Sequence, residues 1–358
     1  IHKTAVIGAG VMGAGLAQWL SKCGFPVLLK DIDRTRVASG MRMIHRLFRE
    51  AKRYGILTQQ EASRCLDVIT PVTQDVPLHL IDLVIEAAVE SLEVKKRIFA
   101  GLSEKASPET ILATNTSALS VTALAEAPGV THPERVIGIH FFNPVSRMKL
   151  VEVVVTPYTS PKVVERVLGF VRAIGKIPIV VKDSPGFLVN RILMPYLIGA
   201  GNLVDQGHDP EVVDEAMLDF GMPMGPLRLL DEIGLDVAEH VVTTMIEAFG
   251  ERFESPRLLK EMVDEGNLGK KTGSGFYRYV GGKTETISRF RKQKDSLTCQ
   301  EISRHLAGLM TDESVRCLEE GLVEKADQID LAMILGTGFA PFRGGPMRWA
   351  RGLGNPHE

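Results

Sequence analysis

The feature that most constrains this chain is a glycine-rich turn between an apolar run and a helical pattern. Residues 4–10 read TAVIGAG, and Gly8-Ala9-Gly10-Val11-Met12-Gly13 fits the spacing GxGxxG. The first glycine permits a tight turn, the second lets a ligand approach the backbone, and the third lets helix and strand pack closely. Because the helix that follows presents N–H groups at its start, this arrangement favours a bound phosphate. A glycine-rich turn without a ligand is the alternative.

An acidic residue about 20 positions after such a turn would complete a dinucleotide-binding fingerprint. Asp31 lies 18 residues after Gly13 and closes the apolar run PVLLKD. A carboxylate there would accept hydrogen bonds from ribose hydroxyls and repel a 2′-phosphate, which favours NAD over NADP. Asp33 is the alternative acid.

The first half of the chain alternates short apolar runs with helical patterns. Runs rich in Val, Ile and Leu predict buried parallel strands at residues 4–10, 26–31, 82–88, 110–117 and 135–141. Two more strands are expected at 150–156 and 177–183, with a helix over 161–174 between them. This alternation predicts an α/β fold with a Rossmann-type sheet.

The pattern changes at Asp183-Ser184-Pro185-Gly186, which we interpret as a domain junction. Beyond it the sequence reads as helical. The segment VDEAM (213–217) recurs as IDLAM (329–333), which indicates either two related domains or chance similarity of amphipathic helices. A Gly- and Lys-rich stretch at 266–290, followed by the charged RFRKQKD, predicts a linker. We expect an NAD-binding Rossmann-type domain over residues 1–183, then two related all-helical domains over 184–282 and 283–358.

Charge, hydropathy and cysteine usage exclude several classes of protein. Lys and Arg number 42 against 44 Asp and Glu, so no basic field indicates nucleic-acid binding. No apolar run approaches the roughly 18 residues of a transmembrane segment, and no signal peptide is visible. The four cysteines form no CxxC pair, which argues against a metal site or a disulfide framework. Reduced thiols indicate an intracellular, reducing compartment: cytoplasm in a bacterium, mitochondrion or peroxisome in a eukaryote.

His140 is the strongest candidate for chemistry. It ends a predicted strand in IGIHFFNP, and Glu152 follows twelve residues later in MKLVEVVV. If the two strands pair antiparallel about a turn near Ser146, the two side chains face each other. A carboxylate beside an imidazole fixes its tautomer and stabilises the imidazolium, which suits a general base. From the pattern alone, a structural histidine is the alternative.

Other polar residues follow strand ends, where ligands bind in open α/β sheets. Ser117 closes the strand at 110–117 and is expected either to hydrogen-bond a substrate oxygen or to cap a helix from Ala118 onward. Glu90 and Lys95 follow the strand at 82–88, and either form an exposed helix pair or reach the nicotinamide ribose.

A basic segment lies between residues 34 and 53. It contains seven Arg and Lys residues together with His45. Such a segment predicts either a solvated helix face or a docking surface for the polyanionic part of a substrate, such as the phosphates of coenzyme A.

Taken together, these stretches resemble the 3-hydroxyacyl-CoA dehydrogenase family. The resemblance spans the whole chain. Its matching segments are GAGVMGAGLA (8–17), EAAVESLEVKKRIF (86–99), ATNTSALSV (113–121), HFFNPVSRMKLVEVV (140–154), KDSPGFLVNR (182–191) and GKKTGSGFYRY (269–279).

The resemblance implies NAD-dependent oxidation of (S)-3-hydroxyacyl-CoA to 3-oxoacyl-CoA in fatty-acid β-oxidation. By resemblance, His140 removes the proton from the 3-hydroxyl, Glu152 orients and supports that histidine, and Ser117 and Asn190 hydrogen-bond the substrate oxygen. The residues that the resemblance assigns to NAD, beside Gly8, Gly10 and Gly13 of the turn, are Met12, Asp31, Val89, Glu90, Lys95, Ser117 and Asn143.

The length of the chain suggests a multifunctional relative. By resemblance, single-activity members end near KTGSGFY, whereas this chain continues for about 80 residues. It therefore resembles the dehydrogenase part of multifunctional β-oxidation proteins, in which an enoyl-CoA hydratase region comes first. Residue 1 is Ile rather than Met, so we expect such a region upstream in the native polypeptide and no hydratase activity here. The alternatives are a CoA-independent hydroxyacid dehydrogenase and a non-catalytic NAD-binding structural protein.

Overall fold

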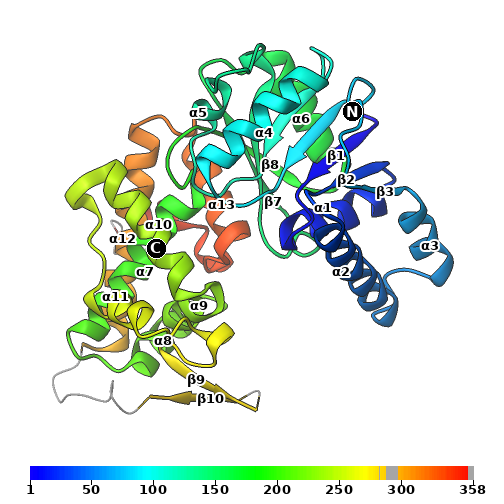
Figure 1. Cartoon of the computed structure of the whole chain (residues 1–358). Helices are drawn as coiled ribbons and strands as arrows, with labels where there is room; N and C mark the ends of the chain where they lie inside the picture. Colours follow the sequence, from blue (N-terminus) through cyan, green and yellow to red (C-terminus); the bar gives the residue numbers. More distant parts are fainter. Residues whose placement is uncertain (282, 288–296, 354–358) are drawn as a thin grey trace. The chain divides into compact units, whose positions relative to one another are not determined.

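The computed structural model describes residues 1–281, 283–287 and 297–353. The chain divides into two compact units, Ile1–Asp183 and Ser184–Glu358 (Figure 1). The charged segment at 289–295, expected to end a linker, lies outside the described residues. The division of the second unit into domains at 184–282 and 283–358 stays a prediction.

The first unit is built around one sheet with the strand order β3-β2-β1-β4-β5-β6-β7-β8. Its strands are β1 Thr4–Ile7, β2 Val27–Lys30, β3 Ile69–Val72, β4 Leu83–Glu86, β5 Ile111–Thr114, β6 Val136–Phe141, β7 Leu150–Val155 and β8 Ile177–Lys182. All seven predicted strands are present. The addition is β3, an edge strand whose ITPV sequence exposes Thr70 and Pro71 and therefore lacks the apolar continuity of a buried strand.

The order of the strands reverses beside the glycine turn. β1 pairs in parallel with β2 on one side and with β4 on the other. The chain therefore changes direction across the sheet at β1, and ligands bind at such a switch point beyond the carboxyl ends of the strands. All residues of β1, β4 and β5 are buried, as expected for strands covered on both faces.

Helices flank the sheet of the first unit (Figure 1). They are α1 Val11–Lys22, α2 Arg34–Arg53, α3 Gln59–Asp67, α4 Leu92–Lys105, α5 Val121–Ala125, the short η1 Pro133–Arg135, and α6 Pro161–Ala173. The basic segment forms α2, whose buried residues recur every three or four positions and leave the arginines on the outer face. Asp33, the alternative acid for the ribose, caps this helix by accepting a hydrogen bond from the Arg36 N–H at 2.8 Å. Both interpretations of the basic face stay predictions.

The second unit is mainly helical. Its helices are α7 Val189–Asp205, α8 Pro210–Phe220, α9 Pro226–Ile233, α10 Leu235–Phe249, η2 Gly250–Arg252, α11 Arg257–Asp264, η3 Lys270–Thr272, α12 Cys299–Glu319, α13 Ala326–Thr337, η5 Pro341–Arg343 and α14 Pro346–Leu353. One antiparallel hairpin, β9 Tyr277–Val280 with β10 Lys283–Thr286, departs from the expected all-helical composition.

The linker predicted over 266–290 is wrong for the residues around this hairpin. The carboxylate of Asp231 accepts hydrogen bonds from the N–H groups of Phe276 and Tyr277, at 2.9 and 3.0 Å. A Cβ on Gly275 would lie only 1.9 Å from Oδ1 of Asp231. Two glycines of the stretch that suggests a flexible spacer, Gly269 and Gly275, are therefore required for close packing against α9.

The sequence repeat in this unit has a structural counterpart. Asp214 of α8 accepts hydrogen bonds from the N–H groups of Leu227 and Arg228 at the start of α9. Asp330 of α13 accepts one from the N–H of Met347 at the start of α14, at 2.7 Å. In both copies an aspartate thus satisfies the first N–H groups of the next helix, where a negative charge is favourable.

All four cysteines are free thiols. Among the described residues, no helix is both long enough and apolar enough to cross a membrane.

Candidate active site

The predicted His140–Glu152 pairing is confirmed. β6 and β7 run antiparallel with His140 directly opposite Glu152, and His140 Nδ1 lies 2.6 Å from Glu152 Oε2. His140 is 5% exposed and Glu152 is completely buried. Since a buried carboxylate needs a hydrogen-bond partner, Nδ1 is the ring nitrogen that donates, and Nε2 is the one that can take a proton.

Asn115 fixes the end of the strand that carries the histidine. Its side-chain Oδ1 accepts a hydrogen bond from the Phe141 N–H at 2.9 Å. The ring of Phe142 packs against the imidazole, with centroids 4.5 Å apart. The histidine therefore lies in a rigid setting at the carboxyl end of β6, next to the end of β5.

The glycine turn has the shape that a dinucleotide requires. A Cβ on Gly8 would lie 2.5 Å from the Ala87 carbonyl oxygen, and one on Gly13 would lie 1.8 Å from that of Gly8. By contrast, a Cβ on Gly10 would meet no atom of the described residues within 4 Å, so that face of the turn is open to a ligand. The residues present thus fit a pyrophosphate at the start of α1.

Asp31 lies beside this turn. Its Oδ2 accepts a hydrogen bond from the Ala9 N–H at 2.7 Å, and its Oδ1 accepts one from the Ile32 N–H at 2.7 Å. The carboxylate is therefore held at the end of β2, where an adenosine ribose would lie in this type of fold.

A second buried carboxylate, Glu86, organises the ends of β4 and β5. It accepts hydrogen bonds from Lys95 Nζ at 2.8 and 3.0 Å and from the Thr114 hydroxyl at 2.8 Å. Lys95 is only 1% exposed and also pairs with Glu90 at 3.4 Å. The proposal that Glu90 and Lys95 form an exposed helix pair is therefore wrong. Their contact to the nicotinamide ribose stays a prediction.

Glu86 is a site residue that the motif search missed. The signal was present in the spacing of α4, since Lys95 shares a helix stripe with the buried Phe99 and Leu102. A lysine on a buried stripe needs a buried partner, and the nearest preceding strand ends in Glu86.

Ser117 lies next to this network. Glu90 Oε1 accepts hydrogen bonds from the Ser117 N–H at 2.9 Å and from the Thr116 hydroxyl at 2.5 Å. The alternative role of Ser117 as a helix cap is wrong, because α5 begins later and is capped by Ser120, which accepts from the Ala123 N–H. Its role toward substrate and cofactor stays a prediction.

The remaining predicted site residues fall on different elements. Met12 is half-buried in the first turn of α1, Val89 is 54% exposed after β4, and Asn143 is exposed in the loop between β6 and β7. Asn190 is half-buried in the first turn of α7, in the second unit. The roles assigned to these four residues stay predictions.

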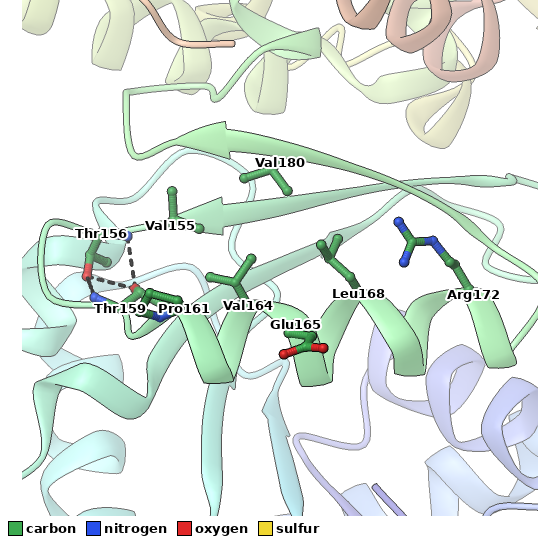
Figure 2. A pocket seen from close by; sticks show the side chains of 9 residues that line it. All are labelled: Val155, Thr156, Thr159, Pro161, Val164, Glu165, Leu168, Arg172 and Val180. Atoms are coloured by element: carbon green, nitrogen blue, oxygen red, sulfur yellow. Dashed lines mark hydrogen bonds between the residues drawn. The ribbon is translucent and has the colours of Figure 1, made fainter. Parts of the chain in front are cut away.

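A groove of about 460 Å³ lies elsewhere on the first unit, between α6 and strands β7 and β8 (Figure 2). Val155, Val164, Leu168 and Val180 line it, with Glu165 and Arg172 on the same helix. None of the predicted site residues lines it. Because β7 is antiparallel to β6, this end of β7 lies toward the start of β6 and away from His140.

Two family models match the chain. The NAD-binding domain of 3-hydroxyacyl-CoA dehydrogenase matches residues 3–184, and the C-terminal domain of the same family matches residues 186–279. Among curated proteins, the fatty acid oxidation complex subunit alpha of Vibrio parahaemolyticus is 36% identical over 355 residues. That match covers 98% of this chain but 50% of the relative, so the chain spans about half the length of the curated relatives it matches.

Solved structures give the same family. The crystal structure of 3-hydroxybutyryl-CoA dehydrogenase from Escherichia coli K12 has a TM-score of 0.87 and 33% identity, covering 99% of this chain and 92% of that one. The dehydrogenase part of multifunctional enzyme 1 from C. elegans has a TM-score of 0.67 and 25% identity, covering 94% and 78% respectively.

Proposed function

The chain belongs to the 3-hydroxyacyl-CoA dehydrogenase family, and from this premise we propose that it oxidises (S)-3-hydroxyacyl-CoA to 3-oxoacyl-CoA in fatty-acid β-oxidation, with NAD as oxidant. The observation that supports this most is the buried His140–Glu152 pair at the carboxyl end of β6. It belongs to the same sheet edge as the glycine turn after β1 and the Glu86 network after β4 and β5.

His140 acts as the general base in this proposal. Its Nε2 takes the proton of the 3-hydroxyl, while Nδ1 stays hydrogen-bonded to Glu152. The buried carboxylate stabilises the imidazolium that forms, because the charge arises where little water screens it. Bound NAD supplies a hydride acceptor for C3 of the substrate. By the family resemblance, Ser117 would bind the substrate oxygen, and the residues that would contact the cofactor are Met12, Asp31, Val89, Glu90, Lys95, Ser117 and Asn143.

The discriminating assay compares a CoA thioester with its free acid. We expect NADH to form from 3-hydroxybutyryl-CoA and NAD, and little or none from free 3-hydroxybutyrate. The reason is that the binding energy of the CoA moiety can position the reacting carbon. Equal turnover of both compounds would favour a CoA-independent hydroxyacid dehydrogenase. NAD binding without any NADH formation would favour a non-catalytic role.

Replacing Glu152 with glutamine tests the supporting carboxylate. The side chain keeps its shape but loses the charge, so we expect kcat to fall about 100-fold. Steady-state kinetics with 3-hydroxybutyryl-CoA measure this effect, and the NADH dissociation constant should stay within about twofold of wild type. A variant with wild-type kcat would remove Glu152 from the mechanism.

The curated relatives are about twice as long as the matched region. We infer that an enoyl-CoA hydratase region works with this dehydrogenase in the native polypeptide, since hydration of a 2-enoyl-CoA produces the 3-hydroxyacyl-CoA used here. The length of these relatives supports this inference, and so does the likeness to the dehydrogenase part of a multifunctional enzyme. A native reading frame without such a region would contradict it.

A further inference from the structure

Lys176 is a buried cation of the first unit that the proposed reaction does not use. It immediately precedes β8 and is 5% exposed. Its Nζ donates hydrogen bonds to the main-chain carbonyl of Met148, at 2.7 Å, and to that of Val145. The same atom lies 4.0 Å from the centroid of the Trp19 ring. The ammonium group is thus held by two carbonyls and an aromatic ring. Among the described residues, no carboxylate pairs with it.

The two carbonyls belong to the loop that joins β6 to β7. This loop follows the strand of His140 and carries Asn143, the predicted cofactor contact. Val145 is 3% exposed and belongs to the hydrophobic core. A Cβ on Gly15 would lie 3.4 Å from Val145 Cγ2, so the loop packs directly on α1.

Trp19 gives Lys176 a second attachment, to α1 itself. The indole Nε1 donates a hydrogen bond to the Ile174 carbonyl at 3.0 Å, which fixes the ring beneath the ammonium group. Helix α1 starts at the glycine turn and carries Met12 in its first turn. Lys176 therefore joins the loop that holds Asn143 to the helix that would receive the pyrophosphate.

We propose that Lys176 is a positioning residue for NAD, because it sets the place of the Asn143 loop relative to the phosphate end of α1. The inference rests on the proposed assignment of Asn143 and Met12 as cofactor contacts. Hydrogen bonds from an ammonium group are stronger than neutral ones, and their loss would leave two inward-facing carbonyls without a donor. The loop would then sample positions in which Asn143 is displaced from the cofactor.

The protonation state of Lys176 gives a second way to test this role, because it changes with pH. Burial lowers the pKa of Lys176 to about 8, from an ordinary value near 10.5. Lys22 at the end of α1 lowers this pKa further, whereas Cys23 raises it. Above pH 8 the group becomes a neutral amine, whose hydrogen bonds and attraction to the Trp19 ring are weaker.

The variant Lys176→Met tests the role directly. We expect the dissociation constant for NADH, measured by fluorescence titration at pH 7, to rise about tenfold. The KM for NAD should rise similarly, while kcat and the KM for 3-hydroxybutyryl-CoA stay within about twofold. The matched control is Lys22→Met, which removes an ammonium 4.8 Å from the same Trp19 ring. Equal weakening in both variants, or none in Lys176→Met, would overturn the proposal.

A measurement on the unaltered chain covers the case in which Lys176→Met does not fold. We expect the NADH dissociation constant to rise at least about threefold between pH 7 and about 9.5, with a midpoint near 8. Cys23→Ser, which removes the neighbouring thiol, should keep this dependence. A dissociation constant that stays constant through pH 8 would contradict the proposal. Because NADH binding needs no acyl-CoA turnover, failure of the proposed oxidation would be seen separately.

Discussion

His140→Ala is expected to lower kcat for 3-hydroxybutyryl-CoA oxidation by about 10³-fold or more. The substitution removes the only proton acceptor that the proposed mechanism places at the substrate hydroxyl, and it leaves the buried Glu152 without its 2.6 Å partner. The cofactor turn after β1 is untouched. The NADH dissociation constant should therefore stay within about twofold of wild type, as measured by fluorescence titration.

A surface pair supplies the control for this variant. His132 and Glu134 also lie 3.0 Å apart, but both side chains are more than 40% exposed. His132→Ala should leave kcat unchanged, since an exposed ion pair contributes little. Retained turnover in His140→Ala, at a rate near that of His132→Ala, would remove His140 from the mechanism. Loss of NADH binding together with turnover would point to a folding defect instead.

The second large effect is expected for Glu313→Leu in the second unit. Glu313 of α12 is 1% exposed and accepts hydrogen bonds from Arg191 Nε at 2.8 Å and Arg252 Nη2 at 3.0 Å. Arg191 is also 1% exposed. The substitution therefore removes the buried partner of a buried positive charge and leaves it paired with the half-exposed carboxylate of Glu320. We expect a loss of about 3–5 kcal/mol in the free energy of unfolding. Thermal denaturation should show a fall of about 10 °C in Tm.

The matched control lies on the same helix. Glu319 is exposed, and Glu319→Gln should change the free energy of unfolding by no more than about 0.5 kcal/mol. If Glu313→Leu is as stable as this control, the buried ion pairs do not hold α7 and α12 together.

The site was partly predictable because some of its geometry is local. An antiparallel pair of strands about a turn centred near Ser146 places His140 opposite Glu152, and β6 and β7 have this register. The glycine turn follows the same logic for two of its glycines, since contacts close to β1 and just after β4 require Gly13 and Gly8. Both features follow from backbone geometry within a short stretch of chain, and this geometry is the same for every sequence.

Other parts of the site depend on which residues meet across the fold. An exposed pair with Glu90 was one of two interpretations of Lys95, yet the fold buries Lys95 against Glu86, nine residues earlier. The stretch at 266–290 read as a linker because glycine and lysine are common in linkers. Two of its glycines, Gly269 and Gly275, instead allow the backbone to approach Asp231. Composition cannot separate these cases, because flexibility and close approach require the same residue.

By itself, the sequence determined the alternation of strands and helices, the glycine turn, the acid at Asp31 and the opposition of His140 and Glu152. These follow from the periodicity of strands and helices and from short-range geometry. Only the tertiary structure decided that Glu86 holds Lys95, that Arg191 meets Glu313, and that Lys176 joins the β6–β7 loop to α1. The physical reason is that a buried charge is satisfied by whichever donors or acceptors packing brings to it, often from distant segments. Local patterns can show that a charge will be buried, as the helix stripe of Lys95 does, but they do not fix which partner it meets.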